Sequence, residues 1–353
     1  MEQTLQQAWP LPLTQQPIVI IGTGDIVNDA HLPAYRKANF SVVGIYDISF
    51  SRAAELASRW GIDNVYQNME QVASLGRHCI YDVAVPPDAI IEVIKQLPDG
   101  AAVLIQKPMG SNLKQARQIR QLCKEKKLIA AINFQLRFSA AMLAVRDAMQ
   151  SGLLGEIVDL EAHLNINTPW QLFPFVKKMD RVEISVHSIH YLDLIRSLLG
   201  NPEGVFVRSL DDPRIPELKQ TRTSAILDYG ANPRVALSIN HNHNFEAKFQ
   251  DAHIRFEGTK GCMMVKLGVL MNYPHGEPDE LWFCKTGGSW QSIPLQGGWF
   301  PEAFIGVMSN IQRYVAGDDS KLLTNIDDAF QTMSLLEACF TSMTTPCVPL
   351  VLD

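Results

Sequence analysis

The first third of the chain alternates short apolar runs with amphipathic stretches. Strands that are buried on both faces read as continuous apolar runs, and helical periodicity between such runs indicates βαβ units. We therefore expect a parallel sheet with connecting helices in this part of the chain. The predicted strands are 17–22, 41–47, 80–85, 101–106 and 128–133, and the clearest predicted helices are 51–60 and 111–127.

The pattern changes near residue 138, where a linking helix is predicted over 139–152. Beyond it, β-rich segments follow one another without long helices, which favours a largely antiparallel open sheet. These segments come after 155–170 and a further helix at 182–193, and they are 223–230, 234–240, 252–258, 261–268 and 280–287. The two closing helices are 301–317 and 325–343. The pattern predicts an α/β chain in two parts: a doubly wound parallel sheet in 1–137, with 1–16 as a solvated N-terminal arm, and an α+β domain in 138–353.

Composition and charge exclude some classes of partner. Charged residues make up 19% of the 353 residues, hydrophobic residues make up 46%, and the formal net charge is -6. A mildly acidic chain without basic runs offers no electrostatic attraction to nucleic acid or to an anionic membrane. No apolar run reaches the roughly 18 residues of a membrane span. The six cysteines are scattered without a C-x-x-C pair, which suits a reducing compartment, so we expect a cytoplasmic protein.

The stretch IIGTGDIV continues from the first predicted strand. Gly22 permits a tight turn, Gly24 lets a pyrophosphate approach the backbone, and the following helix N-terminus offers N–H donors. The third glycine of G-x-G-x-x-G is Val27 here, so a purely structural turn is the alternative. The position in the first βαβ unit favours a Rossmann-type dinucleotide site. The loop residues expected to contact the cofactor are Gly22, Thr23, Gly24, Asp25 and Ile26.

Asp47 ends the second predicted strand, 25 residues after Gly22. A carboxylate there can accept hydrogen bonds from ribose hydroxyls and repel a 2′-phosphate, so NAD is favoured over NADP. Arg52 lies nearby in sequence and would weaken this preference, because a guanidinium attracts phosphate. The alternative is an ordinary aspartate at a strand end.

Two later strand ends carry further candidates. The VPPDAI stretch places Pro86 in a loop along the cofactor, or simply in a strand-to-helix turn. Lys107 follows the fifth strand, at the edge where the ligand crevice of a parallel sheet lies. It can donate to a substrate oxygen and stabilise a developing oxyanion, with a surface lysine as the alternative. The NHNHNF stretch at 240–245 lacks further ligands at metal spacing, so we interpret it as a polar sheet face.

Residues 182–193 read as a helix with apolar residues around most of its circumference. Glu183, His187 and His190 nevertheless fall on one stripe, within about 60° of each other. Buried titratable groups are costly unless they are paired, and Glu183 and His187 have the i, i+4 spacing of a side-chain hydrogen bond. The stripe is therefore either the face of an active site or a satisfied buried Glu–His pair.

Together these motifs resemble the glucose–fructose oxidoreductase / inositol dehydrogenase (Gfo/Idh/MocA) family over nearly the whole chain. The resemblance also includes INFQLRF at 132–138, FEGTKGCMMV at 256–265 and the tail at 330–350. It implies an NAD(P)-dependent oxidoreductase with a Rossmann domain followed by a substrate and oligomerisation domain. It also implies a catalytic or substrate-orienting role for Lys107 and cofactor contacts from Gln106 and Gln135.

The chain departs from the family pattern at two motifs. The family's Glu-Lys-Pro has Gln106 in place of the glutamate, which removes a charge beside Lys107. The family's helix motif Asp-x-Gly-x-His reads Glu183-Ile184-Ser185-Val186-His187. By the resemblance, Glu183 would fix the tautomer of His187, and His187 would take the hydroxyl proton as hydride leaves the same carbon. His190 would lie beside the substrate.

The resemblance implies substrate contacts from the first strand of the second domain and from the loop after it. Strand alternation puts Asn165 on the polar face of the EAHLNINTPW stretch, and Trp170 follows in the loop. Asn165 and Trp170 are therefore the substrate candidates, although Trp170 is equally a core tryptophan. Relatives often pair through the open face of this sheet, so a homodimer or homotetramer is expected.

The resulting expectation is an NAD-dependent dehydrogenase that acts on a sugar or polyol hydroxyl, as in the oxidation of an aldose to its lactone. The substrate would be a small polyhydroxylated molecule, and no metal is expected. The alternatives are an NADP(H)-dependent carbonyl reductase, an NAD-using glycosidase and a non-catalytic cofactor-binding sensor of the same fold. The combination of Lys107, Glu183 and His187 argues against the sensor.

Overall fold

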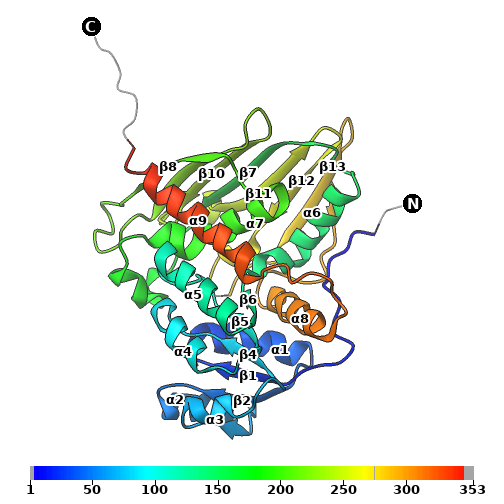
Figure 1. The fold of residues 1–353 in the computed structure, drawn as a ribbon. Helices are drawn as coiled ribbons and strands as arrows, with labels where there is room; N and C mark the ends of the chain where they lie inside the picture. Colours follow the sequence, from blue (N-terminus) through cyan, green and yellow to red (C-terminus); the bar gives the residue numbers. More distant parts are fainter. Residues whose placement is uncertain (1–3, 274, 346–353) are drawn as a thin grey trace. The chain divides into compact units, whose positions relative to one another are not determined.

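The computed structural model describes residues 4–273 and 275–345, and the chain divides into two compact units (Figure 1). The first unit comprises the residues up to Ala144 together with Gln296–Met333. The second comprises Val145–Leu295 together with the residues from Ser334 onward. Residues 138–144 and 296–333 were predicted in the second domain, but they belong to the first unit. Residues 1–3 of the predicted arm and 346–350 of the tail motif, with Cys347, lie outside the described residues.

The first unit contains a six-stranded parallel sheet in the order β3-β2-β1-β4-β5-β6. This is the strand order of the Rossmann fold, which places a ligand crevice at the carboxyl ends of the strands, where the order reverses. The five strands predicted from the sequence are confirmed, and β3 is an additional two-residue strand at the edge. The strands are β1 (Ile18–Ile21), β2 (Val42–Tyr46), β3 (Asn64–Val65), β4 (Ile80–Val83), β5 (Ala102–Ile105) and β6 (Ile129–Ile132).

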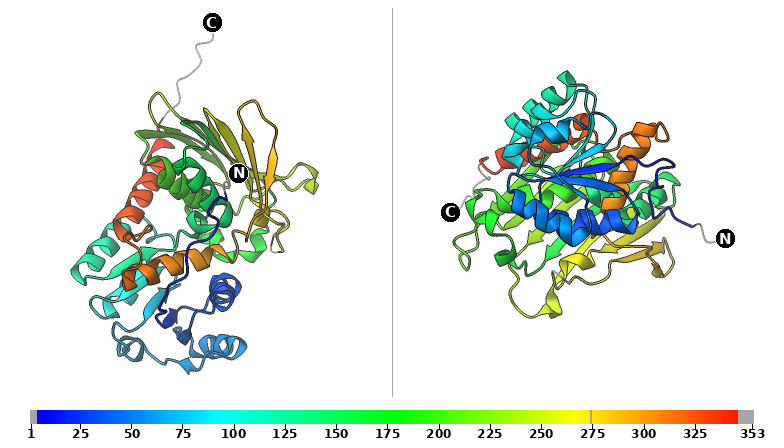
Figure 2. Two further views of the ribbon diagram at one scale, coloured as in Figure 1. Left: turned by 90° about the vertical axis from the view of Figure 1, so that its right-hand side faces the viewer. Right: turned by 90° about the horizontal axis from the view of Figure 1, so that it is seen from below.

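Helices cover both faces of this parallel sheet, as expected for a doubly wound fold (Figure 2). α4 contacts α5, and α1 contacts α8 from the returning segment. Phe304 and Ile311 of α8 share a hydrophobic core with Ile18, Ile20 and Ile45 of the sheet. The helices are α1 (Leu32–Lys37), α2 (Phe50–Trp60), α3 (Met69–Ala73), α4 (Ile90–Gln96), α5 (Leu113–Glu125) and α8 (Ala303–Ala316).

The predicted solvated arm is docked on the first unit at a few points, although most residues of 4–16 are exposed. The Trp9 ring meets Phe138 edge-on with the ring centroids 5.4 Å apart. Its indole N–H donates to Asp319 at 2.9 Å. The Gln16 backbone N–H donates to the Gln312 side chain at 2.9 Å. The polar composition of the arm does not reveal this docking, because it depends on one tryptophan and on backbone bonds to distant residues.

The second unit contains an eight-stranded sheet in the order β14-β13-β12-β11-β7-β10-β9-β8. β7 and β10 pair in parallel, and all other neighbouring strands pair antiparallel, which confirms the predicted largely antiparallel sheet. The edge strands β8 and β14 were not predicted from the sequence. The strands are β7 (Ile157–Asn165), β8 (Gly204–Leu210), β9 (Arg222–Asp228), β10 (Arg234–Asn240), β11 (Asp251–Gly258), β12 (Gly261–Lys266), β13 (Glu280–Lys285) and β14 (Gln291–Ile293).

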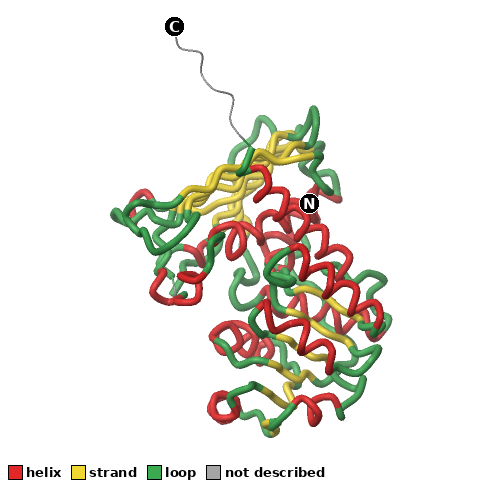
Figure 3. Tube along the Cα trace, turned by 60° about the vertical axis from the view of Figure 1, so that its left-hand side comes forward, coloured by secondary structure: helices red, strands yellow, loops and turns green. Residues whose placement is uncertain are grey.

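β7 shows the alternation expected from its sequence, since Ala162 and Leu164 are buried whereas His163 and Asn165 are half-buried. Helix α7 (Ile189–Leu199) lies against one face of this sheet (Figures 1 and 3). The helices α6 (Ala140–Gln150) and α9 (Ile326–Ser342) each cross the sequence boundary between the units. Among the helices that the structure describes, none is long and apolar enough to cross a membrane.

Candidate functional site

The glycine loop leaves β1 at a position where a side chain has no room. Gly22 has a positive φ of 105°, and its N–H donates to the Tyr46 carbonyl at 2.8 Å. A Cβ atom on Gly22 would collide with the Ala84 carbonyl oxygen, whereas a Cβ atom on Gly24 would meet nothing within 4 Å. Gly22 therefore makes the turn, and the open space at Gly24 fits the approach of a pyrophosphate to the backbone.

The helix after this loop begins with Asp25 and Ile26 and continues as a π-helical turn, η1 (Val27–His31). The Leu32 N–H donates to the Val27 carbonyl, which lies five residues earlier. The first N–H groups of a helix have no intrahelical partner and can bind an anionic group. Asp25 and Ile26 thus place backbone donors beside the glycine loop.

The carboxylate of Asp47 ties the end of β2 to the glycine loop. Its Oδ2 atom accepts from the Thr23 backbone N–H at 2.9 Å and from the Thr23 hydroxyl at 2.8 Å. Its Oδ1 atom accepts from the Ser49 N–H at 2.8 Å. The Arg52 guanidinium donates to the Thr23 carbonyl at 3.2 Å. The structure therefore brings Thr23, Asp47 and Arg52 together, as a dinucleotide site requires.

Lys107 lies directly after β5, and its side chain is half-buried. Loss of solvent around the ammonium group lowers the pKa of Lys107 from 10.5 to about 8. A group with such a pKa changes its protonation within the range where general acids and bases operate. The neighbouring Gln106 accepts a hydrogen bond from the Asn133 amide at 2.9 Å.

Two further predicted cofactor residues lie at the same edge of the parallel sheet. Gln135 is buried in the turn η3 (Gln135–Phe138), and among the described residues its Oε1 atom has no hydrogen-bond partner. Pro86 follows β4 and precedes the turn η2 (Pro87–Ala89). A buried acceptor without a partner suits a ligand that supplies a donor. Together with the open space at Gly24, it fits a dinucleotide held in this unit.

A buried histidine–aspartate pair in the first unit was not predicted from the sequence. His31 Nδ1 lies 2.6 Å from Asp82 Oδ2, and both side chains are fully buried. The Tyr35 hydroxyl donates to the same oxygen at 2.8 Å, and burial, reinforced by the Asp82 charge, raises the pKa of Tyr35 well above its usual value. Asn133 Nδ2 lies 3.4 Å from His31 Nε2 and also donates to Gln106. The His31–Asp82 cluster thereby reaches the residue next to Lys107.

In the second unit, the predicted helix begins with a π-helical turn, η6 (Ile184–Ser188). The Ile189 N–H donates to the Ile184 carbonyl, five residues earlier. The wider turn brings Ser188 over Glu183, and the Ser188 hydroxyl donates to Glu183 Oε1 at 2.6 Å. Glu183 Oε2 has no hydrogen-bond partner within the described part of the chain. The π-helical turn thus gives Glu183 a hydrogen bond from the residue five positions later.

His187 belongs to a group of three aromatic rings. Its ring stacks on that of His241, with the centroids 4.2 Å apart and the planes inclined by 33°. Trp170 lies 5.7 Å from each of the two histidines. His241 Nε2 is 3.7 Å from Glu183 Oε1, and both of these side chains are fully buried. The structure thus brings the predicted residues Glu183, His187 and Trp170 together and adds His241.

His241 was interpreted from the sequence as part of a polar sheet face, and this interpretation is wrong. His241 follows the last residue of β10 and falls in phase with the buried Val235, Leu237 and Ile239, so its ring lies on the buried side and stacks on His187. Its Nδ1 atom lies 2.7 Å from the Thr168 hydroxyl. His243, two residues later, contacts Asn165 at 3.1 Å. The NHNHNF stretch was the available signal, and the strand alternation continued from Ile239 places His241 on the buried side.

A hydrogen-bonded chain supports the ring group from behind. The Trp170 indole N–H donates to Asn242 at 2.9 Å, and the Asn242 amide donates to Asp212 at 3.1 Å. Arg214 binds the same carboxylate through two nitrogens. Hydrogen bonds from Arg214, together with those from Asn242, hold the pKa of Asp212 well below its usual range. The position of Trp170 is therefore fixed by an ionised buried aspartate rather than by apolar packing alone.

The remaining two substrate candidates lie in different surroundings. His190 lies in the first turn of α7 and is only 6% exposed. The Asn165 amide donates to the Phe249 carbonyl at 3.1 Å, and its oxygen accepts from Asn240 at 2.9 Å. Asn165 is thus engaged in contacts among the strand ends, and none of its hydrogen bonds reaches the group of His187, His241 and Trp170.

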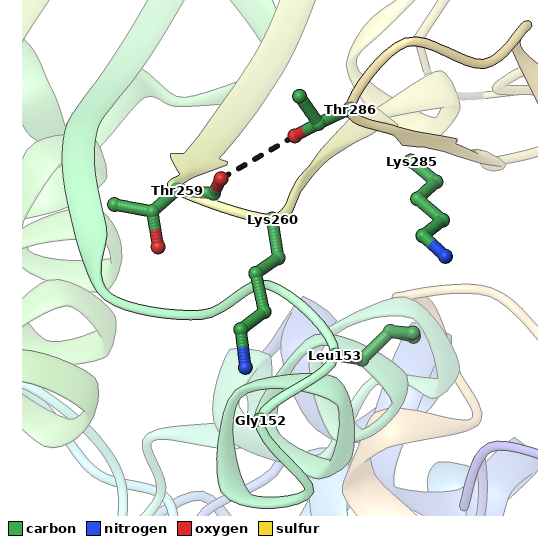
Figure 4. Close-up of a pocket in the computed structure, with 6 residues that line it drawn as sticks. All are labelled: Gly152, Leu153, Thr259, Lys260, Lys285 and Thr286. Carbon is green, nitrogen blue, oxygen red and sulfur yellow. Dashed lines mark hydrogen bonds between the residues drawn. The ribbon is translucent and has the colours of Figure 1, made fainter.

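A pocket of about 360 Å³ lies at the turn between β11 and β12 (Figure 4). The Thr286 hydroxyl donates to the Thr259 carbonyl at 3.4 Å beside it. None of the predicted site residues lines this pocket, so it adds nothing to the assignment of the site. Its lining consists of Gly152, Leu153, Thr259, Lys260, Lys285 and Thr286.

Comparisons with known proteins agree with this geometry. Residues 17–134 match the model of an oxidoreductase family with an NAD-binding Rossmann fold, which confirms the predicted family resemblance for this part of the chain. The uncharacterized oxidoreductase YhhX of Escherichia coli is 28% identical over 202 residues, which are 56% of this chain and 58% of that protein. The D-glucoside 3-dehydrogenase of Escherichia coli is 25% identical over 197 residues, 54% of this chain and 56% of that protein. The chain thus spans little more than half the length of these two relatives.

Solved structures extend the comparison to the fold of nearly the whole chain. An oxidoreductase from Agrobacterium radiobacter, in complex with NAD+, L-tartaric acid and magnesium, has a TM-score of 0.75 at 19% identity and covers 94% of this chain and 96% of its own. The WlbA dehydrogenase from Bordetella pertussis, in complex with NADH and UDP-GlcNAcA, has a TM-score of 0.72 at 19% identity. The match covers 96% of this chain and 100% of that protein's chain. At these identities the likeness shows the fold alone.

Proposed function

We propose that this chain is a dehydrogenase of the Gfo/Idh/MocA type that uses NAD in preference to NADP, a proposal supported by the match of residues 17–134 to the oxidoreductase family with an NAD-binding Rossmann fold. The observation that carries the proposal is the glycine loop, whose Thr23 is bound by the Asp47 carboxylate at the end of β2. A carboxylate at this place favours a ribose diol and repels a 2′-phosphate. When bound, the nicotinamide cofactor accepts the hydride from the substrate carbon.

The proposed roles of the chain's own residues follow from their surroundings. His187 takes the hydroxyl proton as a general base, and the Glu183 carboxylate nearby stabilises the resulting imidazolium. Lys107 donates a hydrogen bond to the substrate oxygen while its ammonium form is present. Trp170 is 7% exposed and belongs to a hydrophobic cluster with Val176 and Val182, so its proposed role is to support the His187 ring, which it meets edge-on. Asn165 and His190 remain proposed substrate contacts.

We propose a sugar or polyol as the substrate, with an aldose oxidised to its lactone as the first candidate. Two relatives support the class, since one is named D-glucoside 3-dehydrogenase and another, from Ensifer adhaerens and 26% identical over 263 residues, is named 1,5-anhydro-D-fructose reductase. The relative that acts on D-glucosides raises the alternative of oxidation at a ring hydroxyl rather than at the anomeric carbon.

The test is a panel of aldoses, their methyl glycosides and polyols, offered with NAD and with NADP while the absorbance of the reduced cofactor is followed. Lactone formation requires a free anomeric hydroxyl, so the proposal expects turnover of an aldose and none of its methyl glycoside. Turnover of both sugars would move the reaction to a ring hydroxyl. A silent panel together with turnover of a bulky aromatic substrate would show that the substrate class is wrong.

We also propose that the protein assembles as a homodimer or homotetramer through the sheet of the second unit. Phe206 and Ile226 are cross-strand neighbours on β8 and β9 and are 65% and 51% exposed. Large apolar side chains that stay exposed side by side on a sheet favour association with another surface. Sedimentation of the full chain and of the Phe206→Glu variant tests this, because a monomer in both cases would contradict the proposal.

A further inference from the structure

We propose that His241 is a positioning residue that orients the His187 ring by stacking on it and, through the ring nitrogen that faces the Glu183 carboxylate across 3.7 Å, sets how readily His187 gives up its proton. The inference deepens the proposed function and rests on His187 being its base. His241 is fully buried, so it reaches the reaction only through its neighbours. The contacts of its ring and of its two nitrogens carry the argument.

The two nitrogens of His241 meet groups of opposite character. Nδ1 lies 2.7 Å from the Thr168 hydroxyl, which can donate to it. Nε2 lies 3.7 Å from the Glu183 carboxylate, which can only accept when ionised. When Thr168 donates to Nδ1, the Nε2–H points at Glu183 across a gap that is too long for a hydrogen bond. His241 is then neutral and directs the positive end of an N–H dipole at the carboxylate.

Because the His241 ring stacks on the His187 ring, the orientation of His241 also constrains His187. The His241 and His187 ring centroids are 4.2 Å apart, so neither ring can turn without displacing the other. Trp170 lies against both rings and is itself held by Asn242. His241 therefore fixes the orientation of the His187 ring and compensates part of the Glu183 charge that His187 experiences.

The other ionisable groups around Glu183 come from two more elements. Tyr191 of α7 and Cys339 of α9 each have a pKa raised by burial and, to a smaller extent, by the Glu183 charge, to about 12 for Cys339. Both therefore stay neutral near neutral pH. His190 of α7 lies near in sequence, and the ion pair of Asp212 with Arg214 lies behind Asn242. Removing the His241 N–H dipole therefore changes the effect of the Glu183 charge on His187 and introduces no new charge.

The first experiment follows the His187 imidazole by NMR titration, which requires no substrate. His241→Phe keeps a stacking ring but removes the N–H that faces Glu183. The uncompensated carboxylate should then hold the proton of His187 more strongly, so its titration midpoint should move to higher pH. His253→Phe is the matched control, because His253 stacks on His163 and pairs with Asp251 on β11. An unmoved midpoint in folded His241→Phe would overturn the proposal.

Glu183→Gln should shift the His187 titration midpoint in the opposite direction. It removes the charge that stabilises imidazolium, so the His187 midpoint should move to lower pH. In the double variant, His241→Phe should have no further effect, because the carboxylate on which His241 acts is gone. An equal shift by His241→Phe with and without Glu183 would contradict the coupling. If His241→Phe does not fold, Thr168→Val is the second variant, since it removes the hydroxyl that orients His241 and should move the midpoint in the same direction.

The last experiment uses turnover on whichever sugar the panel identifies. His241→Phe should lower kcat on the order of 10-fold, the scale of a small misplacement of reacting groups, with little change in KM for NAD. His241→Gln keeps an amide N–H for Glu183 and should recover most of kcat and the original pH profile. A loss of kcat that follows melting temperature, with no movement of the pH profile, would show a purely structural role. Failure of the sugar panel would contradict the proposed substrate but would leave the NMR result to decide the role of His241.

Discussion

Each unit of the protein contains a buried histidine beside a buried carboxylate, and each pair adjoins a π-helical turn. In the first unit, His31 contacts Asp82 directly at 2.6 Å, and Tyr35 donates to the same oxygen. In the second unit, His241 remains 3.7 Å from Glu183 and stacks on His187. Both carboxylates leave one oxygen without a hydrogen-bond partner within the described residues, so the distances distinguish the two clusters.

The difference between these two histidine–carboxylate distances indicates that the two clusters have different roles. A contact of 2.6 Å is a short hydrogen bond that holds one arrangement, whereas 3.7 Å is beyond hydrogen-bond distance. Glu183 accepts its short hydrogen bond from the neutral Ser188 hydroxyl and not from an imidazole, so its charge can act on a proton that arrives on a nearby histidine. We therefore expect the His31–Asp82 cluster to govern stability, and the group around His187 to govern turnover and its pH dependence.

The largest expected effect is on turnover in the second unit. His187→Ala should lower kcat on the order of 10²- to 10⁴-fold, because a positioned general base contributes about that much. NAD affinity and melting temperature should barely change, since the residue acts on the substrate. Ile189→Val is the control, because Ile189 is fully buried two residues away and its truncation costs stability alone. If both variants lose activity in proportion to their loss of stability, the comparison between the clusters fails.

In the first unit, the expected effect is on stability rather than on turnover. Asp82→Ala should lower the free energy of unfolding by about 3–5 kcal/mol, because it leaves His31 buried without its partner. Replacing both His31 and Asp82 by leucine should cost less than Asp82→Ala alone, since no buried polar group remains unpaired. Urea unfolding of these variants and of the exposed control Asp63→Ala measures the difference. A double variant as unstable as the sum of its parts would show that shape, and not charge pairing, holds the cluster.

Lys107 tests whether the first unit also contributes to turnover. Its pKa of about 8 means that the donating ammonium is present below that pH and is lost as the pH rises through it. kcat/KM should therefore fall above pH 8, and Lys107→Met should lower activity by about 10- to 100-fold and abolish this alkaline limb. Lys114→Met, on the exposed side of α5, is the control. Activity that instead rises through pH 8 and depends on Lys107 would identify the neutral amine as the base.

The smallest expected effect concerns the cofactor loop. Asp47→Ser should narrow the preference for NAD over NADP by about 10-fold, because it removes the repulsion of a 2′-phosphate and leaves Arg52 available. Fluorescence titration with both reduced cofactors measures the ratio, with the exposed Asp63→Ser as the control. If the unaltered protein binds the two cofactors equally well, Asp47 does not set a preference for NAD over NADP.

Much of the fold could be predicted from the pattern of apolar residues. Strands of the parallel sheet are buried on both faces and read as apolar runs, and the alternation in β7 reads as one face in the core and one outside it. The edge strands β3, β8 and β14 were missed, because an edge strand has fewer buried neighbours to impose a pattern. The docking of Trp9 was missed because it depends on Phe138 and Asp319, which are distant in sequence.

The candidate site also contains residues that the sequence predicts and contacts that only the structure shows. Gly22, Gly24, Asp47 and Lys107 could be named from the sequence, because each stands next to a strand end that the pattern locates. Tertiary structure alone decided the partners of the buried charges. Asp82 sits in an otherwise apolar run and meets His31 only because the π-helical turn η1 packs on the sheet. In the second unit, a π-helical turn brings the Ser188 hydroxyl to Glu183. His241 reaches His187 because folding brings the end of β10 beside the π-helical turn η6, and periodicity along the chain carries no information about contacts between segments that only folding brings together.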